Sequence, residues 1–143
     1  MPSWLWYTFL AAISGSLSVV LAKAGLREAS EYTSLFVRTG ILFSVTTAIT
    51  FRSGQLSDII SLNKQSLLIL IATGLCTSIY WIFYYKALRL ASAHQVAALD
   101  KAGIIVTVLL SALVLNEGIS IMTVLGVLLI IVGCVLIVNK NAV

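Results

Sequence analysis

The chain has 143 residues, of which 60% are apolar and only 10% are charged, and its mean hydropathy is +1.09. Soluble domains carry about a quarter charged residues, so this composition excludes an ordinary soluble protein and predicts an all-α membrane protein. The formal net charge of +4 is typical of cytoplasmic loops in membrane proteins. We therefore expect the partners to be a lipid bilayer and a small molecule, and not nucleic acid.

Five apolar segments are long enough to cross a bilayer as helices, because about twenty residues span a hydrocarbon core about 30 Å thick. These five transmembrane helices are expected at about 4–26, 31–51, 66–86, 95–115 and 119–138. The connections after the third and fourth segments are short, so the last three helices should be antiparallel neighbours. The longer connection, 52–65, contains LSDIISL, which predicts a short interfacial helix.

Basic residues are distributed unequally between the two sides that five spans create. The side of the N-terminus receives Arg52 and Lys64, whereas the other side receives Lys23, Arg27, Lys86, Arg89 and Lys140. Since Lys and Arg are enriched in cytoplasmic loops, this difference predicts an outside N-terminus and a cytoplasmic C-terminus.

Four aromatic residues lie close to the end of the third segment: Tyr80, Trp81, Tyr84 and Tyr85. Their spacing of i, i+1, i+4 and i+5 gives a broad aromatic face on a helix. Two interpretations remain open. The face is either part of the aromatic belt at a membrane interface, or the wall of a substrate pocket that stacks on flat or cationic solutes.

Asp100 and Lys101 lie inside the fourth segment, in the stretch AALDKAG. Ionisable residues at such positions are costly and mark substrate pathways, proton relays or ion pairs. Because neighbouring residues on a helix point about 100° apart, we expect the two not to pair with each other. Asp100 shares its face with a stripe of small and polar residues, Gly103, Thr107 and Ser111, whereas Lys101 is long enough to reach the headgroups.

A carboxylate at the depth of Asp100 needs a cation or water nearby. Arg38 in the second segment is our first choice of partner, and Lys23 at the end of the first segment is the second. Two alternatives remain open: a structural ion pair that holds the second and fourth helices together, or a site that binds substrate or transfers a proton.

The sequence shows no Cys/His cluster, no nucleophile elbow and no phosphate loop. We therefore expect neither an enzyme nor a bound metal or cofactor. Cys76 and Cys134 each lie within an apolar run, and both are expected to be buried thiols.

The stretch YYKALRLASAHQVAALDKAGIIVTVLLSALVLNEG and the segment that follows it resemble the C-terminal half of an EamA-type repeat from the drug/metabolite transporter superfamily. The resembling pattern is an aromatic-rich helix end with KAL, a small-residue helix with LDK, Glu117 just past it, and a last helix with Gly126 and Gly133. Gly15 in the first segment also fits. Ser14 departs from the pattern, since an aromatic residue usually precedes that glycine.

The single-repeat, five-helix bacterial and archaeal members are the group most similar to this chain, and FVRTGIL with Arg38 also fits them. The resemblance implies one EamA-like domain over 1–143, in the inner membrane of a prokaryotic cell. It implies a secondary transporter for a small metabolite or drug, working by alternating access. The alternative is a non-transporting membrane subunit that assembles with or modulates another membrane protein.

Larger members of the superfamily consist of two such repeats of inverted topology, with substrate between them. A single repeat therefore implies a dimer, either a homodimer, antiparallel or parallel, or a heterodimer with a paralogue. The unequal charge distribution argues against equal insertion in both orientations. The residues expected in substrate binding or coupling are Asp100, Lys101, Arg38, Lys23, Tyr80, Trp81, Tyr84 and Thr107.

Overall fold

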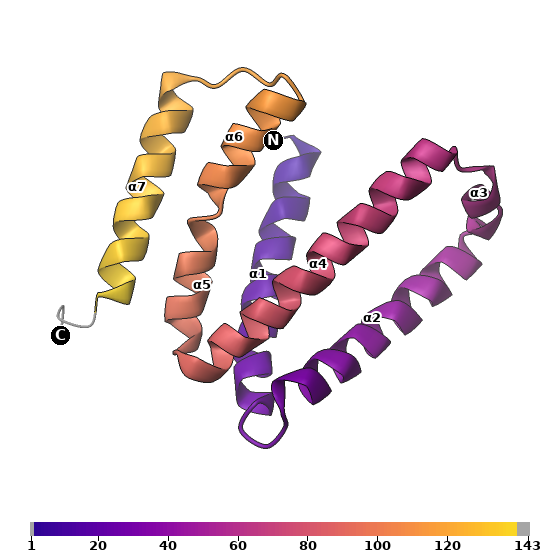
Figure 1. The fold of residues 1–143 in the computed structure, drawn as a ribbon, viewed down its shortest axis with the longest axis horizontal. Helices are drawn as coiled ribbons and strands as arrows, with labels where there is room; N and C mark the ends of the chain where they lie inside the picture. The colour runs from indigo at the N-terminus through magenta and orange to yellow at the C-terminus, as the bar shows by residue number, and fades with distance from the viewer. Residues whose placement is uncertain (1, 140–143) are drawn as a thin grey trace. The chain divides into compact units, whose positions relative to one another are not determined.

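The computed structural model describes residues 2–139, which form helices joined by short connections (Figure 1). The helices are α1 (Ser3–Gly25), α2 (Glu31–Arg52), α3 (Leu56–Ser61), α4 (Lys64–Leu90), α5 (Ala93–Lys101), α6 (Ile104–Val114) and α7 (Ile121–Val138). Five stretches are long and apolar enough to cross a membrane, with α5 and α6 together forming one of them. The prediction of an all-α membrane protein with five spans is confirmed. Lys140, one of the basic residues counted for the orientation, lies outside the described residues.

Serine side chains fix where two of the spans begin. The Ser30 hydroxyl accepts a hydrogen bond from the Thr33 backbone N–H, and the Ser120 hydroxyl accepts one from that of Thr123, both at 3.1 Å. Each bond satisfies one of the N–H groups that a helix leaves unpaired at its start. Ser120 therefore starts α7 two residues later than the sequence pattern suggests. The predicted short helix in the connection between the second and third spans is confirmed as α3.

The fourth span is broken, whereas the apolar pattern predicts one continuous helix over 95–115. The Ala102 N–H donates to the Leu99 carbonyl at 3.0 Å, and the Gly103 N–H donates to the Asp100 carbonyl at 3.1 Å. These bonds reach three residues back rather than four, which tightens the backbone and ends α5. Gly103 has a low helix propensity, and the β-branched Ile104 follows it. The break therefore falls directly after Asp100 and Lys101.

The chain divides into two compact units. The first unit comprises the residues up to Val20 together with those from Leu90 onward. Within it, α5 and α7 pack against each other, and Val96 and Cys134 are its buried apolar residues. The Cys134 thiol donates to the Ala98 carbonyl with a Sγ–O distance of 2.9 Å, so α7 is held directly to the backbone of α5.

The second unit, Leu21–Arg89, has its core where α1 and α4 end. Its buried apolar residues are Leu26, Tyr84, Tyr85 and Leu88. Cys76, earlier in α4, is exposed. The prediction of a buried thiol is thus confirmed for Cys134 and wrong for Cys76, because the outer face of a membrane helix is as apolar as its inner face.

Many large apolar side chains lie on the exterior of the spans. Phe36 on α2 is 79% exposed, Leu113 on α6 is 77% exposed and Met122 on α7 is 78% exposed. A soluble protein rarely exposes contiguous apolar surface on this scale. Lipid tails or another apolar chain must therefore cover these faces.

Candidate functional site

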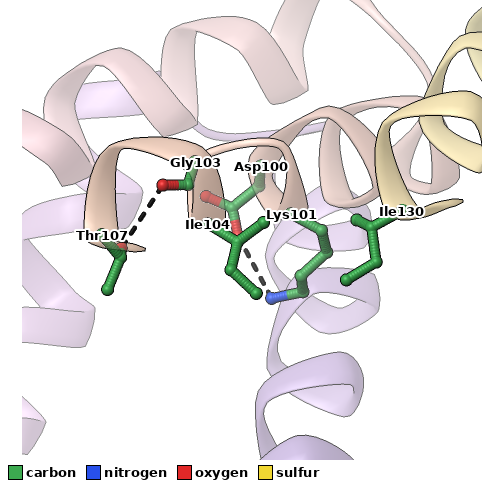
Figure 2. Close-up of a pocket in the computed structure, with 6 residues that line it drawn as sticks. All are labelled: Asp100, Lys101, Gly103, Ile104, Thr107 and Ile130. Carbon is green, nitrogen blue, oxygen red and sulfur yellow. Dashed lines mark hydrogen bonds and ion pairs between the residues drawn. The ribbon is translucent and has the colours of Figure 1, made fainter. Parts of the chain in front are cut away.

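A hollow of about 530 Å³ lies beside the break between α5 and α6, and we call it the helix-break hollow (Figure 2). It is lined by Asp100, Lys101, Gly103, Ile104, Thr107 and Ile130. The structure thus brings together three of the residues expected in substrate binding or coupling, namely Asp100, Lys101 and Thr107. Ile130 reaches the hollow from α7, and nothing in its apolar run distinguishes it in the sequence.

Asp100 and Lys101 form an ion pair at the end of α5. The Nζ of Lys101 lies 3.3 Å from Oδ2 of Asp100 (Figure 2). The expectation that these neighbours do not pair is wrong, because the long lysine stem bends back and α5 ends at Lys101, so no further helical turn restricts it. The side chains are 73% exposed for Lys101 and 24% exposed for Asp100. The pair therefore lies at the rim of the hollow, where a solute can reach it.

Thr107 stands one turn beyond the break and turns its hydroxyl to the backbone. Its Oγ1 donates to the Gly103 carbonyl at 3.3 Å, and its N–H reaches the same oxygen at 3.1 Å (Figure 2). A hydroxyl that donates in this way keeps its lone pairs free to accept hydrogen bonds. Ser111, predicted on the same stripe, instead donates to the Val108 carbonyl and is not among the residues that line the hollow.

The four aromatic residues at the end of α4 form one cluster, which we call the aromatic cluster: Tyr80, Trp81, Tyr84 and Tyr85. The Trp81 ring meets those of Tyr80, Tyr84 and Tyr85 edge to face, with centroids 5.0 to 6.1 Å apart, as aromatic pairs prefer. Tyr84 is 8% exposed and Tyr85 3%, whereas Tyr80 is 41% exposed. Two of the rings thus belong to the core of the second unit, and the cluster's role in binding substrate stays a prediction.

Arg38 reaches this cluster from α2. Its Cζ lies 3.4 Å from the centroid of the Trp81 ring. A cation over an aromatic face is stabilised by about 0.5 to 2 kcal/mol, depending on how far it is desolvated. The arrangement joins two of the predicted site residues, Arg38 and Trp81, which lie far apart in the sequence.

Lys23, the last basic residue of α1, donates from Nζ to the Leu88 carbonyl near the end of α4. Arg89, in the last turn of α4, donates from Nη1 to the carbonyls that follow α1, those of Leu26 at 3.4 Å and Ala29 at 2.9 Å. Each helix thus supplies the cation for the other's C-terminal end. Carbonyl oxygens at helix ends lack partners inside the helix, and cations are favourable there.

We call this exchange of cations the C-terminal clamp. Arg89 adds an ion pair with Glu31 at the start of α2, where Nε lies 3.7 Å from Oε2. The clamp was not predicted from the sequence, although a basic residue in the last turn of two helices is a signal for it. Asp100 belongs to the first unit, whereas Arg38 and Lys23 belong to the second. The predicted pairing of Asp100 with either cation therefore stays a prediction.

Comparison with known proteins gives two related results. Residues 2–139 match the EamA-like transporter family. A relative from Sinorhizobium sp., named an uncharacterized transporter in the cobO 3′ region, is 32% identical over 134 residues, which cover 94% of this chain and 95% of the relative. No solved structure matches the chain. With its five apolar spans, the chain therefore belongs to the EamA-like transporter family, as an integral multi-pass membrane transporter.

Proposed function

We propose that this transporter is a secondary carrier, which moves a small metabolite or drug across the inner membrane of a prokaryote by alternating access. The observation that carries the proposal is the Asp100–Lys101 ion pair beside a break in a membrane-spanning helix. Carriers bind substrates at interrupted helices within the bilayer, and ionisable residues there mark substrate or ion pathways.

The helix-break hollow supports a mechanism in which substrate competes for the ion pair. A substrate ammonium takes the place of Lys101 on the Asp100 carboxylate, or a substrate anion takes the place of Asp100 on Lys101. Either exchange avoids an unpaired charge in a medium of low dielectric, which is strongly unfavourable. The lone pairs of the Thr107 hydroxyl accept a further hydrogen bond from the bound molecule.

The same exchange offers a means of coupling. A carboxylate at bilayer depth that loses its cation is more stable when it binds a proton. In this scheme Asp100 is the residue that couples the movement of protons to that of substrate.

We further propose that the carrier works as a dimer of half-size repeats, with antiparallel, parallel and paralogue pairs as the possible arrangements. The alignment with the Sinorhizobium relative covers 95% of that protein, so the relative is also of single-repeat size. The exposed apolar faces of α4 and α6, which include Phe83 and Leu113, offer surface for a second chain. Cross-linking at single cysteines along both helices in native membranes should capture dimers, and only monomers at every position with transport intact would exclude the dimer.

Transport by purified protein in lipid vesicles tests the carrier function. Uptake of amino acids, sugars, organic acids and cationic drugs is measured with and without a pH gradient, and then repeated for two matched variants. Asp100→Asn keeps the size and removes the charge, so uptake of any transported solute should fall by about a hundredfold, or about 2.7 kcal/mol. Asp58→Asn, on exposed α3, should transport within about twofold of the unmodified protein. Normal transport by Asp100→Asn across about pH 6 to 8 would show that the carboxylate is structural.

A further inference from the structure

The second unit contains a cation that its own acidic residues do not neutralise. Arg38 lies seven residues after Glu31, the first residue of α2, and hence about 10 Å along the helix. Glu31 pairs with Arg89 of the C-terminal clamp. Among the described residues of the second unit, Arg38 forms no ion pair. A guanidinium charge inside a spanning helix is costly, and a cation–π contact offsets this cost only in part.

The contact with Trp81 fixes how the guanidinium is oriented. Its Cζ lies 3.4 Å from the ring centroid, and a delocalised C–N bond is about 1.3 Å long. An edge-on guanidinium would place a nitrogen within about 2.5 Å of the ring, well inside the normal contact distance of about 3.5 Å. The two planes must therefore lie roughly parallel. In this orientation the N–H donors of Arg38 point outward around the edge of the stack, in the fork that matches a carboxylate or phosphate.

Ser34 adds a second unused polar group. It lies one turn before Arg38 on the same face of α2, and its hydroxyl is buried without a hydrogen-bond partner among the described residues. An unsatisfied buried hydroxyl is unfavourable and is rare in native structures. A ligand oxygen held by Arg38 would give this hydroxyl a partner.

The geometry points to an oxyanion subsite formed by Arg38 and Ser34, with the Trp81 ring as its floor. The Tyr80 ring stands edge to face beside Trp81, with centroids 5.0 Å apart, and is 41% exposed, so the subsite has an open apolar side. The matching ligand is therefore a carboxylate or phosphate attached to an apolar or aromatic body. A small organic anion and the headgroup of an anionic phospholipid share this chemistry. As a substrate site the subsite rests on the proposed carrier function, whereas binding of an oxyanion is independent of it.

Trp81 supplies a direct signal for binding. The chain has three tryptophans, and the other two, Trp4 and Trp6, are exposed on α1, so changing both to Phe leaves Trp81 as the sole reporter. In this background, benzoate and inorganic phosphate are titrated against protein in phosphatidylcholine nanodiscs, with benzylamine as the cationic control. We expect a saturable change in Trp81 fluorescence with benzoate, and binding at least tenfold tighter than that of benzylamine.

Matched variants decide whether Arg38 is responsible. Arg38→Gln should weaken benzoate binding at least tenfold, Arg38→Lys by less, and Ser34→Ala by a few fold. Arg52→Gln, which removes an exposed cation at the end of the same helix, should leave binding unchanged. The helical circular dichroism signal shows whether each variant folds. If Arg38→Gln does not fold, the comparison of Arg38→Lys and Ser34→Ala with the unmodified protein replaces it as the test. Equal benzoate affinity in all Arg38 and Ser34 variants, or no saturable response to either oxyanion, would overturn the subsite.

Two further experiments are needed. One distinguishes a lipid headgroup from a soluble anion as the ligand, and the other distinguishes failure of the oxyanion subsite from failure of the carrier function. If phosphatidylglycerol in the nanodiscs competes with benzoate, a lipid headgroup occupies the subsite; if benzoate binding is unaffected, the occupant is a soluble anion. Normal transport of organic anions by Arg38→Gln would contradict the substrate site and leave the carrier function intact. Benzoate binding without transport of any solute would contradict the carrier and leave the subsite intact.

Discussion

The C-terminal clamp and the helix-break hollow both contain basic side chains, but these side chains bind different kinds of partner. In the clamp, Lys23 and Arg89 bind backbone carbonyls at the ends of partner helices. In the hollow, Lys101 binds the side chain next to it in the sequence, and it remains 73% exposed. A backbone carbonyl cannot leave its helix, whereas a side-chain pair at an open rim can be replaced by a solute. We infer from this difference that the clamp serves stability, and the proposed function assigns the hollow to transport.

The largest effect expected to distinguish the two regions is on transport. Lys101→Gln removes the cation that Asp100 pairs with at the rim of the hollow, so we expect transport in vesicles to fall at least tenfold, or about 1.4 kcal/mol. The free energy of unfolding should change by less than about 1 kcal/mol, because exposed ion pairs contribute little. Lys101→Arg, which keeps the charge, is the control and should retain most of the transport. A loss of stability without a loss of transport would place Lys101 with the structural cations.

The next effect concerns the clamp. Arg89→Gln removes charge-assisted hydrogen bonds to two carbonyls, and these contribute about 1.5 to 3 kcal/mol each when buried. Since Arg89 is half exposed, we expect a loss of about 1 to 2 kcal/mol in total, measured as a lower melting temperature in detergent. Lys86→Gln on the same helix removes only a distant contact with the Tyr32 ring, 5.7 Å from the centroid, and should cost at most about 0.5 kcal/mol. Equal melting temperatures for the two variants would contradict the clamp.

The smallest effect tests the break itself. A Cβ at Gly103 would lie 3.1 Å from the Asp100 carbonyl oxygen, whereas one at Gly133 would meet nothing within 4 Å. Gly103→Ala should therefore shift the backbone of Asp100 and lower transport by about two- to fivefold, or about 0.4 to 1 kcal/mol. Gly133→Ala should leave transport unchanged. If both variants transport alike, the geometry of the break is not needed for function.

The spans are predictable from the sequence because each is a long apolar run, and the serines that start α2 and α7 are local signals. The break in the fourth span is missed because the apolar pattern continues through Gly103. The local signs of it are that glycine, two residues after Lys101, and the β-branched Ile104 that follows it. Hydropathy indicates how favourably a segment partitions into lipid. It carries little information on where the backbone N–H groups change from bonding a carbonyl four residues back to bonding one three residues back.

The candidate site also has parts that the sequence predicts and parts that it does not. Helical spacing is enough to place Asp100 and Thr107 on one face, whereas the same spacing turns Lys101 away from Asp100, so their ion pair is missed. The stacking of Arg38 on Trp81 joins α2 to α4, and Ile130 comes from α7; both depend on how distant helices pack. The clamp is missed for a further reason, since its acceptors are backbone carbonyls, which every residue possesses and no sequence pattern distinguishes.

The bond from the Cys134 thiol to the Ala98 carbonyl has a mechanical consequence. It ties α7 to α5 on one side of the break, and the structure gives no matching bond from α7 to α6 among the described residues. Bending at Ala102 and Gly103 would therefore keep α5 and α7 together as one rigid unit, while α6 rotates relative to them. Asp100 belongs to α5 and Thr107 to α6. Such a movement therefore changes the distance between these two residues and opens or narrows the hollow.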